Sequence, residues 1–244
     1  MTTAAVVFVI CFAYFVQAAF GFGAGLIALP LLSLMIDPKT AVVILAIFPV
    51  LTSVVLIPLR HDIDWKKIIR LGPGIAIGLP FGLFLFASTS GKLISICLAL
   101  FVLVYVAGNF TKRNFFAAIE DKLPAHMQPF AVGLATGILS GLLGNGGPPM
   151  AAYLQKNTSS AVVFRATLLA IFLCVNIVRC FFLGMTNFIR GDVIHYSLIA
   201  LPFFAVAIFA GYHVPKKISQ SSFDTGINVL LLLSAFSILA KQIL

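Results

Sequence analysis

The sequence predicts an all-α protein that crosses a membrane several times and is built from two four-segment repeats. Hydrophobic residues make up 61% of the chain and charged residues only 9%, far less charge than a soluble domain carries. Apolar runs follow one another along the chain, most of them about 17–23 residues long, the length that a helix needs to cross about 30 Å of hydrocarbon. In addition, a glycine-broken apolar run occurs twice.

The apolar runs define the segments, because charged or turn-forming residues bound each of them. In chain order we expect helical segments at Thr3–Ile36, Thr40–Leu59, Ile68–Ala87, Lys92–Phe110, Gln128–Gln155, Ala161–Leu183, Val193–Val214 and Phe223–Leu239.

The first and fifth segments are interrupted near their middles, at Gly21–Gly25 and at Gly144–Pro149. Glycine- or proline-interrupted apolar segments at matching positions of two halves indicate a transporter binding site. Irregular backbone persists at membrane depth only where protein or a water-filled cavity satisfies it. The sequence therefore predicts a ligand site between the two breaks, near the middle of the membrane.

The third segment carries Gly74, Gly78 and Gly82 at intervals of four residues. This spacing places the glycines on one helix face, where they permit close packing of a second helix. Asp64 and Asp192 each precede an apolar segment, and we expect both to be helix N-caps.

The two halves correspond in sequence, which predicts a first membrane repeat at 1–110, a connecting loop at 111–127 and a second membrane repeat at 128–244. The matching pairs include Gly21 with Gly144, Asp64 with Asp192 and Pro73 with Pro202.

The orientation of the halves depends on segments 1 and 5. If all segments span, the repeats are parallel and the loop Lys and Arg residues divide nine to five between the two sides. If segments 1 and 5 are re-entrant hairpins, the repeats are inverted and the division is ten to four. Because positive residues concentrate in cytoplasmic loops, the sequence favours the inverted arrangement by one charge.

The start of each second half-helix is one candidate for substrate binding, since free N–H groups and the helix dipole attract anions there. The residues concerned are Gly21, Phe22, Gly23, Gly25, Asn145, Gly146, Gly147 and Pro148. Asn145 adds a side-chain amide donor. The alternative is that these glycines only permit tight packing.

The sixth segment is the other candidate. Arg165, Asn176 and Arg179 fall within a sector of about 60° on one helix face, together with Phe172. Guanidinium groups bind oxyanions through paired hydrogen bonds. The alternative for both arginines is that they reach toward the lipid head groups.

Several functions are disfavoured. All seven carboxylates lie at segment ends or in loops, whereas proton- or cation-coupled carriers usually have one within the membrane. Export of an anion would then move net charge. The basic residues occupy short loops, which suits anionic lipid and not nucleic acid. We expect no metal, no cofactor and no catalytic residue, because no corresponding motif is present.

The motifs resemble the sulfite exporter TauE/SafE family of membrane anion transporters. The resemblance is carried by Gly21-Phe22-Gly23-Ala24-Gly25-Leu26, by Ile63-Asp64-Trp65 with Gly72-Pro73-Gly74, by Gly144-Asn145-Gly146-Gly147-Pro148-Pro149, and by Phe164-Arg165-Ala166-Thr167. It implies export or uptake of sulfite, sulfonates or related small organic and sulfur anions. We expect an exporter, in a multi-pass protein of a bacterial inner membrane, with a homodimer among its candidate partners.

A membrane thiol-electron carrier is the alternative from a different class. It would need a cysteine at each helix break. Cys11 lies ten residues before Gly21, and no cysteine lies near the second break. We read Cys11, Cys97, Cys174 and Cys180 as small buried hydrophobic residues.

Overall fold

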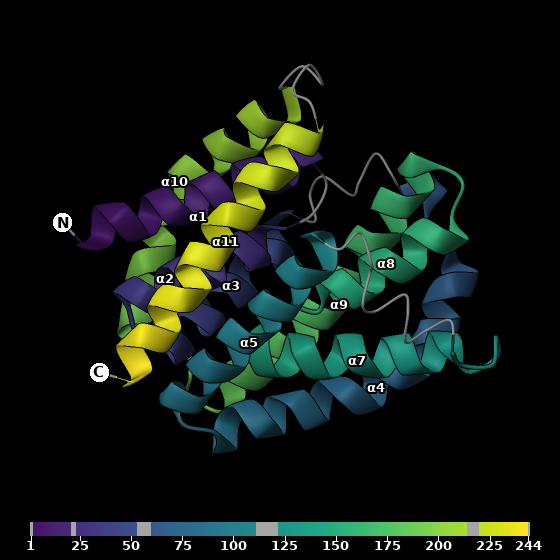
Figure 1. Ribbon diagram of the computed structural model, residues 1–244, viewed down its shortest axis with the longest axis horizontal. Helices are drawn as coiled ribbons and strands as arrows, with labels where there is room; N and C mark the ends of the chain where they lie inside the picture. Colours follow the sequence, from purple (N-terminus) through teal and green to yellow (C-terminus); the bar gives the residue numbers. More distant parts are fainter. Residues whose placement is uncertain (1, 21–22, 53–59, 111–121, 214–219, 244) are drawn as a thin grey trace. The chain divides into compact units, whose positions relative to one another are not determined.

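The computed structural model describes residues 2–20, 23–52, 60–110, 122–213 and 220–243. Within these ranges the regular elements are all helices (Figure 1). They are α1 Thr2–Phe20, α2 Ala24–Met35, α3 Pro38–Thr52, α4 Trp65–Ser88, α5 Gly91–Phe110, α7 Gln128–Leu143, α8 Gly147–Asn157, α9 Ala161–Met185, α10 Gly191–His213 and α11 Gln220–Ile243. The predicted all-α fold is confirmed, and so are the breaks within segments 1 and 5.

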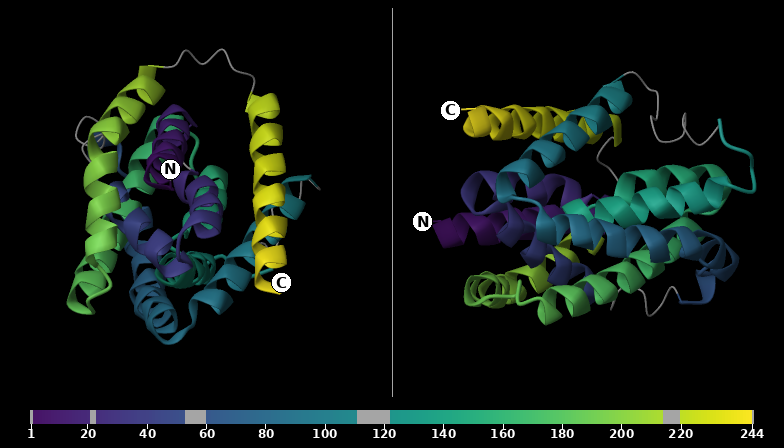
Figure 2. Two further views of the ribbon diagram at one scale, coloured as in Figure 1. Left: turned by 90° about the vertical axis from the view of Figure 1, so that its left-hand side faces the viewer. Right: turned by 90° about the horizontal axis from the view of Figure 1, so that it is seen from below.

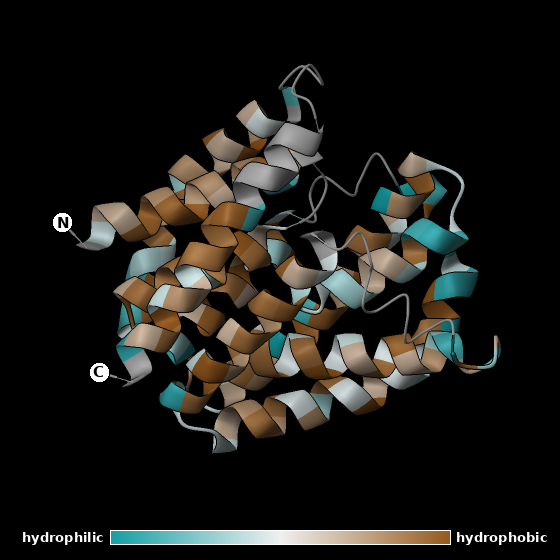
Figure 3. Cartoon of the chain, in the orientation of Figure 1, coloured by the Kyte–Doolittle hydropathy of each residue, from teal (hydrophilic) through white to brown (hydrophobic). Residues whose placement is uncertain are grey.

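Apolar side chains cover the outside of these helices. Figure 3 shows brown, hydrophobic residues along the helices and teal, hydrophilic residues gathered at helix ends and connections. On α4, Gly74, Gly78 and Gly82 are buried, whereas Phe84 is 65% exposed. Large exposed apolar residues with buried glycines are typical of a helix that faces lipid. Among the described residues, α4, α5, α9 and α10 are long and apolar enough to cross a membrane.

The chain forms two compact units, and each draws helices from both halves of the sequence. Unit 1 comprises residues 1–45, 90–111 and 189–244, and unit 2 comprises residues 46–89 and 112–188. Unit 1 therefore holds α1, α2, α5, α10 and α11, and unit 2 holds α4, α7, α8 and α9. The predicted repeat boundaries concern sequence similarity and stay a prediction.

In unit 2, α4 and α7 lie side by side (Figures 1 and 2). A Cβ added at Gly74 would meet Phe130 and Leu134, whereas one added at Gly82 would meet Ile138 and Gly141. Contacts that advance together along both helices mean that α4 and α7 run parallel. The predicted close-packing role of the α4 glycines is confirmed, and α7 contributes its own glycines at 133, 137 and 141.

α9 also runs in the direction of α4. The N–H of Asp64, before α4, donates to Thr167 Oγ1 near the start of α9 at 3.0 Å. At the other end, the rings of Phe86 and Phe188 lie 5.2 Å apart between centroids. Since α4, α7 and α9 all begin at one end of unit 2, and α8 ends just before α9, the pair α7–α8 must return to the end from which it started. Segment 5 is therefore a re-entrant hairpin.

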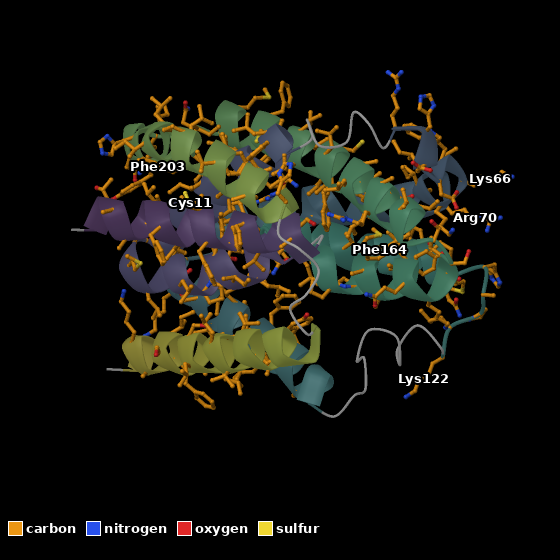
Figure 4. The ribbon with its side chains drawn as sticks, turned by 90° about the horizontal axis from the view of Figure 1, so that it is seen from above. Cys11, Lys66, Arg70, Lys122, Phe164 and Phe203 are labelled. Carbon is orange, nitrogen blue, oxygen red and sulfur yellow. The ribbon has the colours of Figure 1, made fainter. Side chains whose placement is uncertain are left out.

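The end of unit 2 where these helices begin is strongly basic. Figure 4 shows Lys66, Arg70 and Lys122 there, with their nitrogen atoms directed away from the helices. Three more basic residues belong to the same end. Arg60 precedes α4, Lys67 lies in its first turn, and Lys156 lies in the last turn of α8. Because positive residues concentrate on the cytoplasmic side of membrane proteins, the charge of this end predicts that it faces the cytoplasm.

In unit 1, α1 and α10 run parallel. The rings of Tyr14 and Phe204 lie 5.0 Å apart, and a Cβ at Gly211 would lie 2.8 Å from Ala18 Cβ. Lys241 Nζ, at the end of α11, donates to Leu34 O at the end of α2 at 3.1 Å. Both chain termini lie at the same end of this unit (Figure 2). Because α1 starts there and α2 ends there, segment 1 is also a re-entrant hairpin.

The two predicted caps have different outcomes. Asp64 is the N-cap of α4 and accepts a hydrogen bond from Lys67 N at 3.2 Å. Asp192 is not an N-cap, because α10 already begins at Gly191. The bond from Ile194 N to Arg190 O, at 3.1 Å, extends the helix upstream. Asp192 thus lies in the first turn, where its charge still favours the helix dipole.

Candidate functional site

The hairpin of unit 2 turns at Gly144. This residue adopts a left-handed conformation with φ of 72°, which glycine reaches without the steric cost of a Cβ. Its N–H donates to Ser140 O at 3.0 Å, and the N–H of Asn145 donates to Leu139 O at 3.3 Å. The last carbonyl groups of α7 are thereby satisfied by the turn itself.

α8 starts in close contact with α7. A Cβ added at Gly146 would collide with Thr136 O and Ser140 Oγ, so no larger residue fits there without a shift. Thr136 and Ser140 are 8 and 12 residues beyond the first residue of α7. At 1.5 Å per residue, α8 begins about 12–18 Å along α7, close to half of the ~30 Å hydrocarbon thickness.

Hydrogen-bond donors gather at this helix start. Asn145 is 8% exposed, and its Nδ2 is buried without a hydrogen-bond partner among the described residues. No hydrogen bond joins the N–H of Gly146 or Gly147 to another group in the described part of the chain. No side chain caps the helix. The start of α8 therefore presents neutral donors and the positive end of a helix dipole.

α9 lines the other side of the helix start. A Cβ at Gly147 would lie 3.5 Å from Asn145 Oδ1 and 3.6 Å from Phe172 Cζ. The carbonyl of Phe172 accepts a hydrogen bond from Asn176 Nδ2 at 2.8 Å. In turn, Asn176 Oδ1 accepts one from Arg179 Nη1 at 2.9 Å. A continuous set of contacts thus leads from Asn145 to Arg179.

Arg179 is 1% exposed. This burial contradicts the alternative that its side chain reaches the head groups, because the guanidinium stays inside unit 2. Its fixed charge creates a positive potential in apolar surroundings, where screening by water is weak. Asn176 is 7% exposed and engages Arg179 and Phe172 through its amide.

Arg165 lies apart from this group. It is 11 residues before Asn176 on α9, a rise of about 16 Å along the axis, and it is partly exposed. It stands two residues from Thr167, which binds the backbone before α4 at the basic end. The structure therefore brings Asn176 and Arg179 together and leaves Arg165 near the basic end of unit 2.

The first break belongs to unit 1. Gly21 and Phe22 lie outside the described residues. Gly23 is the N-cap of α2, with φ of 110°, and Gly25 lies in the first turn of that helix. As at the second break, no side chain caps the helix.

Sequence reasoning missed Thr136 and Ser140, which α7 presents to the start of α8. Thr136 is fully buried, and its hydroxyl has no hydrogen-bond partner among the described residues. The sequence did contain a signal. Thr136 and Ser140 are four residues apart and so share one helix face, next to the face that Gly133 and Gly137 share.

Comparisons with known proteins agree with the geometry. The family model described as "Sulfite exporter TauE/SafE" matches residues 6–238. The chain is 24% identical, over 210 residues, to a protein of Cupriavidus necator named "Probable sulfite/organosulfonate exporter TauE". That match covers 84% of this chain and 81% of the relative. No solved structure matches the chain.

Proposed function

The chain belongs to the sulfite exporter TauE/SafE family, and from this premise we propose that it exports sulfite or small organosulfonates through an anion site at the start of α8. It is a membrane transporter with several membrane-spanning helices, of the type found in bacterial inner membranes. We also propose that it has no enzymatic activity. A homodimer stays a prediction.

The buried amide of Asn145 is the observation that carries the proposal. A buried donor without a partner costs about 1–3 kcal/mol. An oxyanion at the start of α8 would accept from this amide and from the N–H groups of Gly146 and Gly147, and would also interact favourably with the helix dipole. The site is thus better satisfied with an anion than without one.

Arg179 supports an anion and not a cation at this place. Its positive charge stands behind Asn176, whose amide oxygen holds the guanidinium at 2.9 Å. Arg165 lies near the basic end of unit 2, a position that suits attracting the anion toward the hairpin before it binds. Gly23 and Gly25 would offer backbone N–H groups at the corresponding start of α2.

The hairpin topology also supports transport. A half-helix that starts near mid-depth has no spanning role, yet it directs its dipole at a point inside the membrane. The thiol-electron carrier has no comparable support. All four cysteines are free, and Cys180 donates to Ala46 O at 3.2 Å. The expectation that all four are buried is wrong, because Cys174 is exposed and the other three are partly exposed.

The proposal is tested with Asn145→Ala in proteoliposomes that export labelled sulfite or methanesulfonate. Loss of a charge-assisted hydrogen bond of about 1.5–3 kcal/mol raises KM roughly 10- to 150-fold. The variant should be at least as heat-stable as the wild type without ligand, because an unpaired buried donor is removed.

Asn228→Ala is the matched control, since Asn228 in α11 is also 8% exposed. Its KM should stay at the wild-type value. An unchanged KM for Asn145→Ala would remove the start of α8 from the transport path.

A further inference from the structure

The first turn of α8 has fewer hydrogen-bond donors than a helix of ordinary sequence. Its N-cap is Gly146 and its first residue is Gly147, so Pro148 and Pro149 occupy the next two positions. These are positions whose N–H groups have no partner within the helix. Proline has no N–H, and therefore two of the four donors that would point at a ligand are missing.

The start of α2 shows the contrast. There the first turn follows Gly23 with Ala24, Gly25 and Leu26, and each of these residues carries an N–H. The loss of donors is thus a property of the second break, not of both hairpins.

Both prolines are buried, beside a glycine that leaves no room for a Cβ. Because Gly146 has no side chain, it cannot cap an N–H restored at position 148 or 149. A donor restored at either position would belong to the same helix start as Asn145, whose Nδ2 is buried and lacks a partner within the described residues.

We propose that Pro148 and Pro149 set the affinity and the release rate of the transported anion by withholding backbone donors from its site. The inference rests on the proposed function. A helix start with its full set of N–H groups holds an oxyanion firmly, but an exporter must also release it. With two donors removed, binding is carried by Asn145 and the two glycine N–H groups, and release is faster.

The test restores one N–H at a time with Pro148→Ala and Pro149→Ala in the full-length chain. Methanesulfonate is the probe. Calorimetry on the purified protein gives Kd, and efflux from proteoliposomes gives the maximal rate. Each variant should bind about tenfold more tightly and should have a lower maximal rate than the wild type.

Pro129→Ala is the matched control. Pro129 is also buried and occupies the corresponding second position of α7, at the opposite end of that helix from the turn. Its Kd and rate should stay at wild-type values. Kd values for Pro148→Ala and Pro149→Ala equal to or weaker than that of the wild type would overturn the inference.

Two outcomes separate this inference from the proposed function. If the wild type shows no saturable binding of sulfite or methanesulfonate, the proposed function fails. If the wild type binds and Asn145→Ala weakens binding, but neither proline variant tightens it, only the donor inference fails. Should an alanine variant not fold, as judged by its melting curve, the glycine substitution at the same position restores the same N–H and decides the question.

Discussion

Gly137 provides a direct test of the close packing between α4 and α7. A Cβ at this position would lie 2.6 Å from Leu79 N, 2.9 Å from Gly78 C and 3.0 Å from Gly78 Cα. All three atoms belong to the backbone of α4, so none can rotate away. Gly137→Ala therefore forces the two helices apart.

The magnitude follows from these distances. Reaching an ordinary contact of 3.4 Å from 2.6 Å requires a separation of about 0.8 Å. Overpacking of this kind costs about 1–3 kcal/mol. Replacing glycine by alanine within a helix also gains up to about 1 kcal/mol from helix propensity, which must be subtracted through a control.

Gly72→Ala is that control, since Gly72 also lies in the α4–α7 pair but a Cβ there meets nothing within 4 Å. Because Gly72 precedes Pro73, whose ring disfavours a helical residue with a Cβ before it, Gly72→Ala gains less from propensity than Gly137→Ala does. The difference between the two variants is therefore a lower bound on the cost of the clash. In detergent micelles titrated with sodium dodecyl sulfate, Gly137→Ala should have a free energy of unfolding about 1–3 kcal/mol below that of Gly72→Ala. Equal stability of the two variants would refute the close packing described here.

Three further predictions concern charge. Asn176→Asp should pair a carboxylate with Arg179 and cancel its charge, raising the Kd for methanesulfonate about tenfold or more, whereas an unchanged Kd would show that Arg179 does not act on the anion. Lys67 donates to the Asp64 carboxylate at 2.7 Å and holds the pKa of Asp64 below its usual range. The stability of the wild type relative to Asp64→Asn should therefore be greatest above about pH 5 and should decline as the pH falls through and below about 4. A difference in melting temperature that does not depend on pH would contradict this. Each described acidic residue lies outside the α-helices or, as for Asp192 and Asp224, within the first five residues of one. Export of a monovalent anion should therefore follow a potassium–valinomycin potential at about 2.3 kcal/mol per 100 mV, and flux that follows only a pH gradient would exclude it.

The helices were predictable because the membrane imposes a simple rule on composition. Six of the predicted runs each contain one helix, although residues 53–59 of the second run lie outside the described residues, and the two broken runs contain two helices each. The predicted Ala161–Leu183 segment is extended by only two residues, to Met185. The breaks were predictable as well, since glycine and proline interrupt helices by known steric effects. The grouping of helices into units was not, because apolar faces are alike and do not specify their partners.

The sequence predicted which residue types form the candidate site, but it could not predict the hydrogen bonds between them. Helix periodicity places Arg165, Asn176 and Arg179 on one face, yet it ignores the axial distance that leaves Arg165 at the basic end. It also cannot show that the amide of Asn176 is occupied by Phe172 and Arg179. In this structure Asn176 positions Arg179, and its predicted contact with the substrate stays a prediction.

Close backbone contacts connect α4 to α7 and α7 to the start of α8. Because Gly137 and Gly141 lie against α4 backbone atoms, α7 is fixed to a helix long enough to span the membrane. Gly146 in turn fixes the first residue of α8 to the side of α7, at Thr136 and Ser140. The position of the start of α8, where we propose the anion site, is thus determined by backbone contacts and not by flexible side chains. Substitutions in the α4–α7 contact should consequently impair transport as well as stability, although none of those glycines would touch the anion.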